Sequence, residues 1–282
     1  MSRLLRKINT YSLTTTTTKT RTMSNPSASL TLFRGWDEPG KYVWSPFTTK
    51  LEFRLRMSHL PYTRAIGATT SGPKGKVPYV ALTIDSSTQH LADSSLIIQH
   101  LISTGMLQEV NANLSAKETA VDLAVRALLE DKLCFYHSYE RWVKNYYVMR
   151  DYALWAIPYP LRVVIGLLAY RGNMKKLHDQ GTGRFSDREI LGFKREIWEG
   201  VAGMLEESRK GAKGGDADGC FWVLGGKEPT EADASLYGFV VSVLVCEAAG
   251  ESKEVLGMFP VVEEWARRIH ERYFADYEIW EA

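Results

Sequence analysis

The stretch SPFTTKLEFRLRMSHLPY, residues 45–62, contains the signals from which the fold is predicted. Ser45 before Pro46 marks a helix start, because a serine side chain caps the free amides of the first turn and proline fits the first helical position. Helically spaced apolar residues continue this helix to about His59. Residues 62–66 then predict an extended strand.

Further strands flank this helix on both sides. Residues 30–34 alternate as a short strand, which ends in the turn-rich run 35–40. Residues 78–84 predict a third strand and 89–91 a short fourth one, and Asp93-Ser94 opens a second helix. This order implies a right-handed crossover between parallel strands followed by a hairpin. It is the thioredoxin-like arrangement.

The remainder of the chain is predicted to be helical. Three capping boxes each lead into helically spaced apolar residues. They pair Ser115 with Glu118, Ser186 with Glu189, and Thr230 with Asp233. We therefore expect an extension over residues 1–29, a thioredoxin-like domain over 30–106 and an all-helical domain over 107–282.

Composition limits the classes of function. The chain has 282 residues, of which 45% are hydrophobic and 24% charged, enough for a substantial core. Residues 1–29 hold five basic residues and no acid, which leaves 30 basic and 33 acidic residues in the rest. We expect no nucleic-acid partner. The three cysteines form no Cys-x-x-Cys pair and the histidines are dispersed, so no structural metal is expected.

Two segments bear on location. Of residues 1–29, 13 are Ser or Thr, a composition typical of a mitochondrial transit segment and equally of an unstructured tail before a second start at Met23. The apolar stretch 153–170 is broken by Pro158 and Pro160 and carries Arg162, so we predict no transmembrane span. A buried connector or helix pair is expected there, with surface membrane association as the alternative. The location is cytoplasmic or mitochondrial.

Six stretches resemble the failed-axon-connections group, glutathione-transferase-like proteins that are more distantly similar to metaxins. They are SPFTTKLEFRLRMSHLPY (45–62), GPKGKVPYV (72–80), ADSSLIIQHL (92–101), QGTGRFSDREI (180–190), PTEADASLYGF (229–239) and FPVVEEWARRIHERYF (259–274). The resemblance implies a thioredoxin-like N-terminal domain followed by an all-helical glutathione-transferase C-terminal domain. It also implies glutathione as ligand, and it does not by itself specify a reaction.

The candidate catalytic residue is Ser45, at the start of the first helix, where some transferases place the hydroxyl that stabilises the glutathione thiolate. An ordinary helix cap is the competing interpretation. Tyr42, Thr48 and Thr49 are alternative donors. The run SPFT has no cysteine where a redox relative would have Cys-x-x-Cys, so chemistry that needs a protein thiolate is not expected.

Two further motifs resemble the glutathione site. Val77-Pro78 matches the step in which a cis proline presents the preceding main chain to glutathione, and Lys76 could pair with the glycyl carboxylate. Asp93-Ser94 matches the step that holds the γ-glutamyl group, with Ser94 on the carboxylate and Asp93 on the ammonium. The structural alternatives are a trans proline opening a strand, a solvated lysine and a simple helix cap.

The second substrate is predicted to be a small apolar electrophile. An aromatic run could line its pocket opposite Ser45, with His137 as a polar contact: Phe135, Tyr136, Tyr139, Trp142, Tyr146 and Tyr147. The leading hypothesis is conjugation of glutathione to that electrophile. The alternatives are a non-catalytic adaptor in mitochondrial or membrane-associated protein assembly, and a glutathione-dependent isomerase or eliminase. Related transferases are dimers, so a homodimer is a further expectation.

Overall fold

The computed structural model describes residues 28–36, 38–212 and 219–281. The predicted extension over 1–29 therefore lies outside the described residues except for its last two. Residues 213–218 lie outside them as well.

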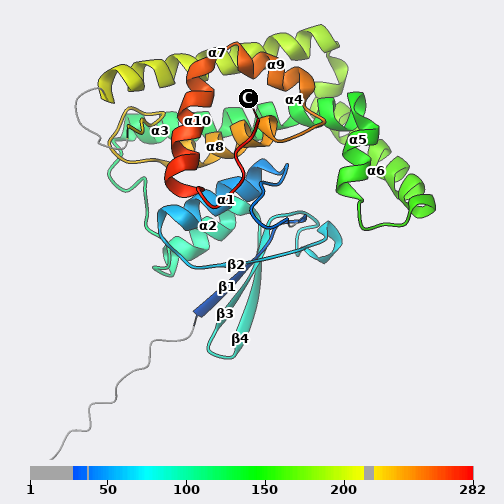
Figure 1. Ribbon diagram of the computed structural model, residues 1–282, viewed down its shortest axis with the longest axis horizontal. Coiled ribbons are helices and arrows are strands. Elements are labelled where there is room, and N and C mark those ends of the chain that lie inside the picture. Colours follow the sequence, from blue (N-terminus) through cyan, green and yellow to red (C-terminus); the bar gives the residue numbers. More distant parts are fainter. Residues whose placement is uncertain (1–27, 37, 213–218, 282) are drawn as a thin grey trace, which may run out of the picture.

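The N-terminal part is a four-stranded sheet in the order β2-β1-β3-β4 (Figure 1). The strands are β1 (Ala28–Phe33), β2 (Thr63–Ala65), β3 (Tyr79–Ile84) and β4 (Ser87–Ala92). β1 runs parallel to β2 and antiparallel to β3, and β3 and β4 form a hairpin. The predicted thioredoxin-like arrangement is confirmed. β1 and β4 are longer than predicted, because their outer residues continue the pairing with β3.

Helices α1 (Pro46–Met57) and α2 (Ser94–Ser103) pack against this sheet. The apolar residues of both helices and of β1 and β3 form one buried cluster, which stabilises the layer by removing apolar area from water. It contains Leu30, Leu32, Leu51, Leu55, Val80, Leu82, Ile97, Ile98, Leu101 and Leu107. The start of each helix is thereby held at a fixed place against the sheet.

The rest of the described chain is helical. Its helices are α3 (Ala116–Ala127), α4 (Cys134–Tyr139), α5 (Tyr146–Ala153), α6 (Tyr159–Gln180), α7 (Asp187–Ala212), α8 (Glu231–Leu244), α9 (Gly250–Gly257) and α10 (Pro260–Tyr273). Two π-helical segments, Leu128–Leu133 and Glu140–Lys144, join α3, α4 and α5 into one nearly continuous run. All three predicted capping boxes form, at the starts of α3, α7 and α8.

Helix α1 lies between the sheet and α8, so it is covered on both sides (Figure 1). The two helices approach closely at Gly238, where an added Cβ would lie 2.2 Å from the Pro46 carbonyl oxygen. Only glycine permits this distance. The contact fixes the N-terminal turn of α1, where Ser45 lies.

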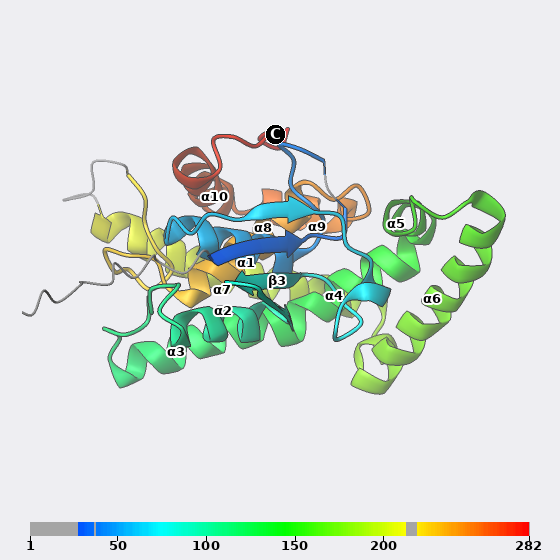
Figure 2. The ribbon, with the colours of Figure 1, turned by 90° about the horizontal axis from the view of Figure 1, so that it is seen from below.

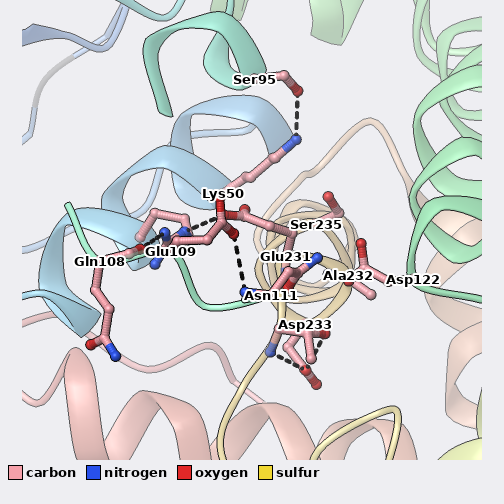
Figure 3. Close-up of polar contacts among 12 residues, drawn as sticks. Lys50, Ser95, Gln108, Glu109, Asn111, Asp122, Glu231, Ala232, Asp233 and Ser235 are labelled. Atoms are coloured by element: carbon pink, nitrogen blue, oxygen red, sulfur yellow. Dashed lines mark hydrogen bonds and ion pairs between the residues drawn. The ribbon is translucent and has the colours of Figure 1, made fainter. Parts of the chain in front are cut away.

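The covered face of α1 carries charged side chains that are paired across the structure (Figure 3). Arg54 Nε lies 2.8 Å from Glu231 Oε1, and a second Arg54 nitrogen donates to the Gln108 carbonyl at 2.7 Å. Lys50 Nζ lies 2.6 Å from Glu130 Oε1. Buried charges need such partners, because losing water costs several kcal/mol per ion.

The stretch over 153–170 forms a turn and the first half of α6, not a buried connector. Pro158 caps α6 and Pro160 occupies its first turn, as their effect on helices requires. Many of its apolar side chains are exposed, among them Leu161 at 53% and Leu168 at 62%. The stretch thus connects α5 to α6 and contains the start of one helix, not a helix pair, and the prediction of burial is wrong. Among the described residues, no helix is long and apolar enough to cross a membrane.

Candidate functional site

The N-terminus of α2 is organised by Asp93, whose backbone φ of 83° turns the chain into the helix. Its Oδ1 accepts hydrogen bonds from the amides of Ser95 at 3.2 Å and Leu96 at 3.4 Å. Partial burial would raise the pKa of Asp93, but the hydrogen bond and charge of Lys76, with these two amides, hold that pKa below its usual value. The carboxylate is therefore ionised at neutral pH.

A small pocket of about 70 Å³ opens beside this helix start. Its lining consists of Phe47, Lys76, Val77, Pro78, Asp93, Ser94 and Glu130. All five residues predicted to bind glutathione thus lie at one place, although they come from two loops separated by a hairpin. The Val77–Pro78 peptide bond is cis, as the resemblance implies.

Ser45 is the one predicted site residue that does not line this pocket. It caps α1, with Oγ accepting a hydrogen bond from the Thr48 amide at 3.4 Å. An oxygen that accepts through a lone pair keeps its own hydrogen for donation. The cap and a role as hydrogen-bond donor are therefore chemically compatible. Phe47, two residues further on, does line the pocket.

The alternative donors are less favourably placed. Tyr42 is buried, and its hydroxyl lies 2.7 Å from the Tyr237 hydroxyl and 2.8 Å from His270 Nδ1. Burial, followed by the interaction with Tyr237, raises the pKa of Tyr42 far above its ordinary value. Thr48 and Thr49 are fully buried and are not part of the pocket lining. Tyr42 is thus part of the core in which the C-terminal residues pack against α8.

Sequence reasoning missed two residues of the pocket, Phe47 and Glu130. Glu130 lies on the π-helical segment Leu128–Leu133, and its Oε1 accepts from Lys50 and from the Ser235 hydroxyl. The Lys50 ammonium also donates to Ser95 Oγ at 2.9 Å (Figure 3). This network connects α1, the start of α2 and α8. One sign of this network was present in the sequence: Lys50 lies among residues of α1 that belong to the core.

A second, larger cavity has a volume of about 720 Å³. Its lining includes Trp44, the residue that precedes Ser45. Three aromatic rings stack at its edge, with the Tyr152 centroid 3.6 Å from Trp44 and 4.7 Å from Trp36. The lining residues come from the loop before α1, from α5, from the turn after α8 and from the C-terminal end. They are Trp36, Glu38, Lys41, Tyr42, Trp44, Val148, Asp151, Tyr152, Leu244, Val245, Glu247, Lys253, Glu278, Ile279, Trp280 and Glu281.

The aromatic run predicted to face Ser45 lines neither of these two pockets. Tyr136 stacks on Phe193, and the Tyr139 hydroxyl donates to Asp187 at 2.8 Å. His137 is fully buried, and burial, followed by the charges of Arg141 and Lys194, lowers its pKa well below the usual value. That prediction is wrong because the rings on α4 contact α6 and α7, and Tyr147 of α5 is exposed.

Residues 46–148 match the family model of the glutathione S-transferase N-terminal domain. Three solved structures are similar in fold. Glutathione transferase GSTFuA3 from Phanerochaete chrysosporium is 17% identical, with 90% of this chain and 99% of that chain covered and a TM-score of 0.53. Rice GST1 in complex with glutathione is 14% identical, with 89% and 92% covered and a TM-score of 0.51.

The third is a maleylacetoacetate isomerase from Anaeromyxobacter dehalogenans 2CP-1, with glutathione bound in its active site. It is 14% identical, with 89% of this chain and 96% of that chain covered and a TM-score of 0.50. At these identities the likeness concerns the fold. The chain therefore has the glutathione-transferase fold, a thioredoxin-like sheet domain followed by a helical region, and its residues 46–148 match the N-terminal domain model of that fold.

Proposed function

We propose that this protein binds glutathione in the pocket at the start of α2. The observation that carries the proposal is the convergence of Lys76, Val77, Pro78, Asp93 and Ser94 on one pocket lining. These residues come from motifs that resemble a glutathione site, and we infer that the chain is a member of the failed-axon-connections group.

The chemistry of the pocket suits the γ-glutamyl end of the ligand. The hydroxyl and the main-chain amide of Ser94 would hold its carboxylate, because the N-terminus of a helix carries a partial positive charge. The next two amides of α2 are already bound by Asp93 Oδ1. The ionised Asp93 would balance the ammonium group of the ligand. The main chain of Val77 would bind the cysteinyl part of the ligand. Lys76 would release Asp93 and pair with the glycyl carboxylate.

The proposed reaction is addition of the glutathione thiolate to a small apolar electrophile. Ser45 would donate a hydrogen bond to the sulfur, which stabilises the ionised thiol. The electrophile would enter the larger cavity, since its lining includes Trp44, which directly precedes Ser45 in the chain and stacks on Tyr152. Aromatic walls of this kind provide apolar contact area for a small ligand.

The test is calorimetric titration of glutathione into the full chain and three variants. Ser94→Ala should weaken binding roughly tenfold, the loss of about one charge-assisted hydrogen bond. Ser45→Ala should keep most of the affinity and raise the pKa of the bound thiol, followed by thiolate absorbance. Ser186→Ala removes a matched helix cap at α7 and should change neither. Absence of binding at millimolar glutathione would end the proposal.

One observation favours a second candidate function. Ser45 lies outside the pocket lining, and Lys76 pairs with Asp93 within it. A protein of this fold that acts as a non-catalytic adaptor needs neither a donor to sulfur nor an open site. Absence of glutathione binding, or binding with no effect of Ser45→Ala on the thiol pKa, would support this candidate over the transferase.

A further inference from the structure

The helix pair α5–α6 carries an unusual concentration of exposed apolar side chains. Of the 17 large apolar residues that are exposed among the described residues, nine lie between positions 147 and 168. They are Tyr147, Val148, Trp155, Tyr159, Leu161, Val163, Val164, Leu167 and Leu168. Exposed apolar area gathered in one place marks an interaction surface, whereas isolated exposed residues do not.

Three of the exposed apolar residues of α6 lie on one side of the helix. Leu161, Val164 and Leu168 follow the three- and four-residue spacing of a single face and are more than half exposed. Gly166 points the opposite way and is buried against Arg150 and Tyr146 of α5. The exposed face of the first half of α6 therefore consists of apolar side chains, and it is directed away from α5.

The charges around this face are mostly basic. Between residues 146 and 179 the chain has two acids: Asp151 lies within 4 Å of two arginines, and Asp179 pairs with Lys175. The five basic residues of this stretch are Arg150, Arg162, Arg171, Lys175 and Lys176. Arg171, Lys175 and Lys176 lie on the last turns of α6 and are exposed. The surface thus combines aliphatic, aromatic and basic side chains.

The position of the pair suits an extended partner. Helices α5 and α6 lie at one end of the long axis of the molecule and stand away from the sheet and from α8 (Figures 1 and 2). A helix pair that projects in this way can lie on a broad surface while the rest of the protein does not touch that surface. Neither helix crosses a bilayer by itself, since no helix of the described ranges, α6 included, is long and apolar enough to do so.

We propose that the α5–α6 pair binds the surface of an anionic lipid bilayer, with the first half of α6 lying in the interface. Aliphatic side chains would enter the acyl boundary, and Trp155 and Tyr159 would lie at headgroup level, where aromatic residues with a polar edge are favoured. Arg171, Lys175 and Lys176 would contact lipid phosphates. A second copy fits less well, because a symmetric contact through this face would bring the basic residues of both copies together.

The experiment is cosedimentation of the full chain with vesicles of phosphatidylcholine, pure or with roughly a third phosphatidylserine. The double variant Val164→Glu/Leu168→Glu places two acids on the proposed face. Leu123→Glu/Met258→Glu is its matched control, since these residues have similar exposure, 58% and 55%, on α3 and beside α9. The N-terminal extension is present in every sample, so its basic residues contribute equally.

The proposal predicts binding of the unchanged protein to anionic vesicles and at least roughly tenfold weaker binding of Val164→Glu/Leu168→Glu. The control variant should bind within about twofold of the unchanged protein. Arg171→Gln/Lys175→Gln should reduce the preference for anionic over neutral vesicles. Circular dichroism during heating checks that all variants are folded.

Three results would overturn the proposal. They are no binding of the unchanged protein to anionic vesicles, equal loss in the control variant, and unaltered binding of Val164→Glu/Leu168→Glu. Sedimentation velocity tests the alternative occupant of this face, a second copy of the chain. A dimer that dissociates in Val164→Glu/Leu168→Glu, together with no vesicle binding, would assign the face to a second copy.

Discussion

Lys76 Nζ lies 2.6 Å from Asp93 Oδ2, so the loop before the cis proline is joined directly to the first turn of α2. The same Asp93 side chain caps that helix through its other oxygen. One carboxylate thereby connects the two segments that would contact glutathione. The ion pair holds the pocket in shape and must open if Lys76 is to reach the ligand.

This ion pair predicts a pH-dependent contribution to stability. The pKa of Asp93 is lowered in the folded protein, so its contribution is present above the unfolded pKa and is lost as the pH falls through the folded value. Lys76→Met should lower the free energy of unfolding by about 0.5 kcal/mol at neutral pH, because the lysine is half exposed. Urea unfolding between neutral pH and pH 3 should show this difference shrinking. Lys74→Met, at an exposed position nearby, is the control, and a difference independent of pH would contradict the assignment.

The close contact between α1 and α8 predicts that Gly238→Ala is strongly destabilising. The new methyl group would lie 2.2 Å from the Pro46 carbonyl oxygen, and the helices must separate to admit it. We expect a loss of about 2 kcal/mol or more in the free energy of unfolding. Gly192→Ala, in α7 with open space around its Cβ position, should stabilise by about 0.5 kcal/mol. Equal changes in the free energy of unfolding in both variants would show that helix propensity, and not the contact between α1 and α8, causes the effect.

The buried pair between Arg54 and Glu231 predicts strong coupling. Burial raises the pKa of Glu231, and the charge of Arg54 opposes this shift. Arg54→Met should cost about 3 kcal/mol, since it leaves a buried carboxylate without its cation. The double variant with Glu231→Gln should be less destabilised than the sum of the two single variants. A double-mutant cycle by chemical unfolding measures this coupling, and additive effects would argue against it.

The hydrogen bonds of Tyr42 predict a structural role for its hydroxyl. Tyr42→Phe removes contacts to Tyr237 and His270 in the core and should cost about 1 to 2 kcal/mol. It should leave the pKa of a bound glutathione thiol unchanged, whereas Ser45→Ala should raise it. Thermal unfolding measures the first effect and thiolate absorbance the second. A thiol pKa that responds to Tyr42→Phe alone would move the donor role to this tyrosine.

Local signals predicted much of the fold and part of the site. The caps at Ser45 and Asp93 were identified because a capping side chain and the amides that it binds are neighbours in sequence. The same applies to the capping boxes of α3, α7 and α8. The five pocket residues were assigned through their resemblance to a known motif. Such a motif indicates which residues come together in the folded protein, whereas the spacing of apolar residues does not.

Contacts between distant segments could not be predicted. Lys50 and Glu130 are 80 positions apart, and their pairing depends on how α1 packs against the π-helical segment. The aromatic residues of α4 have the composition of a ligand pocket, but their rings contact α6 and α7. Side chains of one type can line a core or a pocket, and the choice depends on which elements pack beside them.

The sequence by itself determined the order and the ends of most helices and strands, because caps, prolines and apolar spacing act within a few residues. It also determined that Asp93 and Ser94 stand at a helix start. Only the tertiary structure decided that Ser45 lies outside the pocket lining, that Lys50 and Arg54 are buried with acidic partners, and that the apolar face of α6 is exposed. The physical reason is that burial and pairing are properties of packed elements, and an apolar run alone does not specify which element covers it.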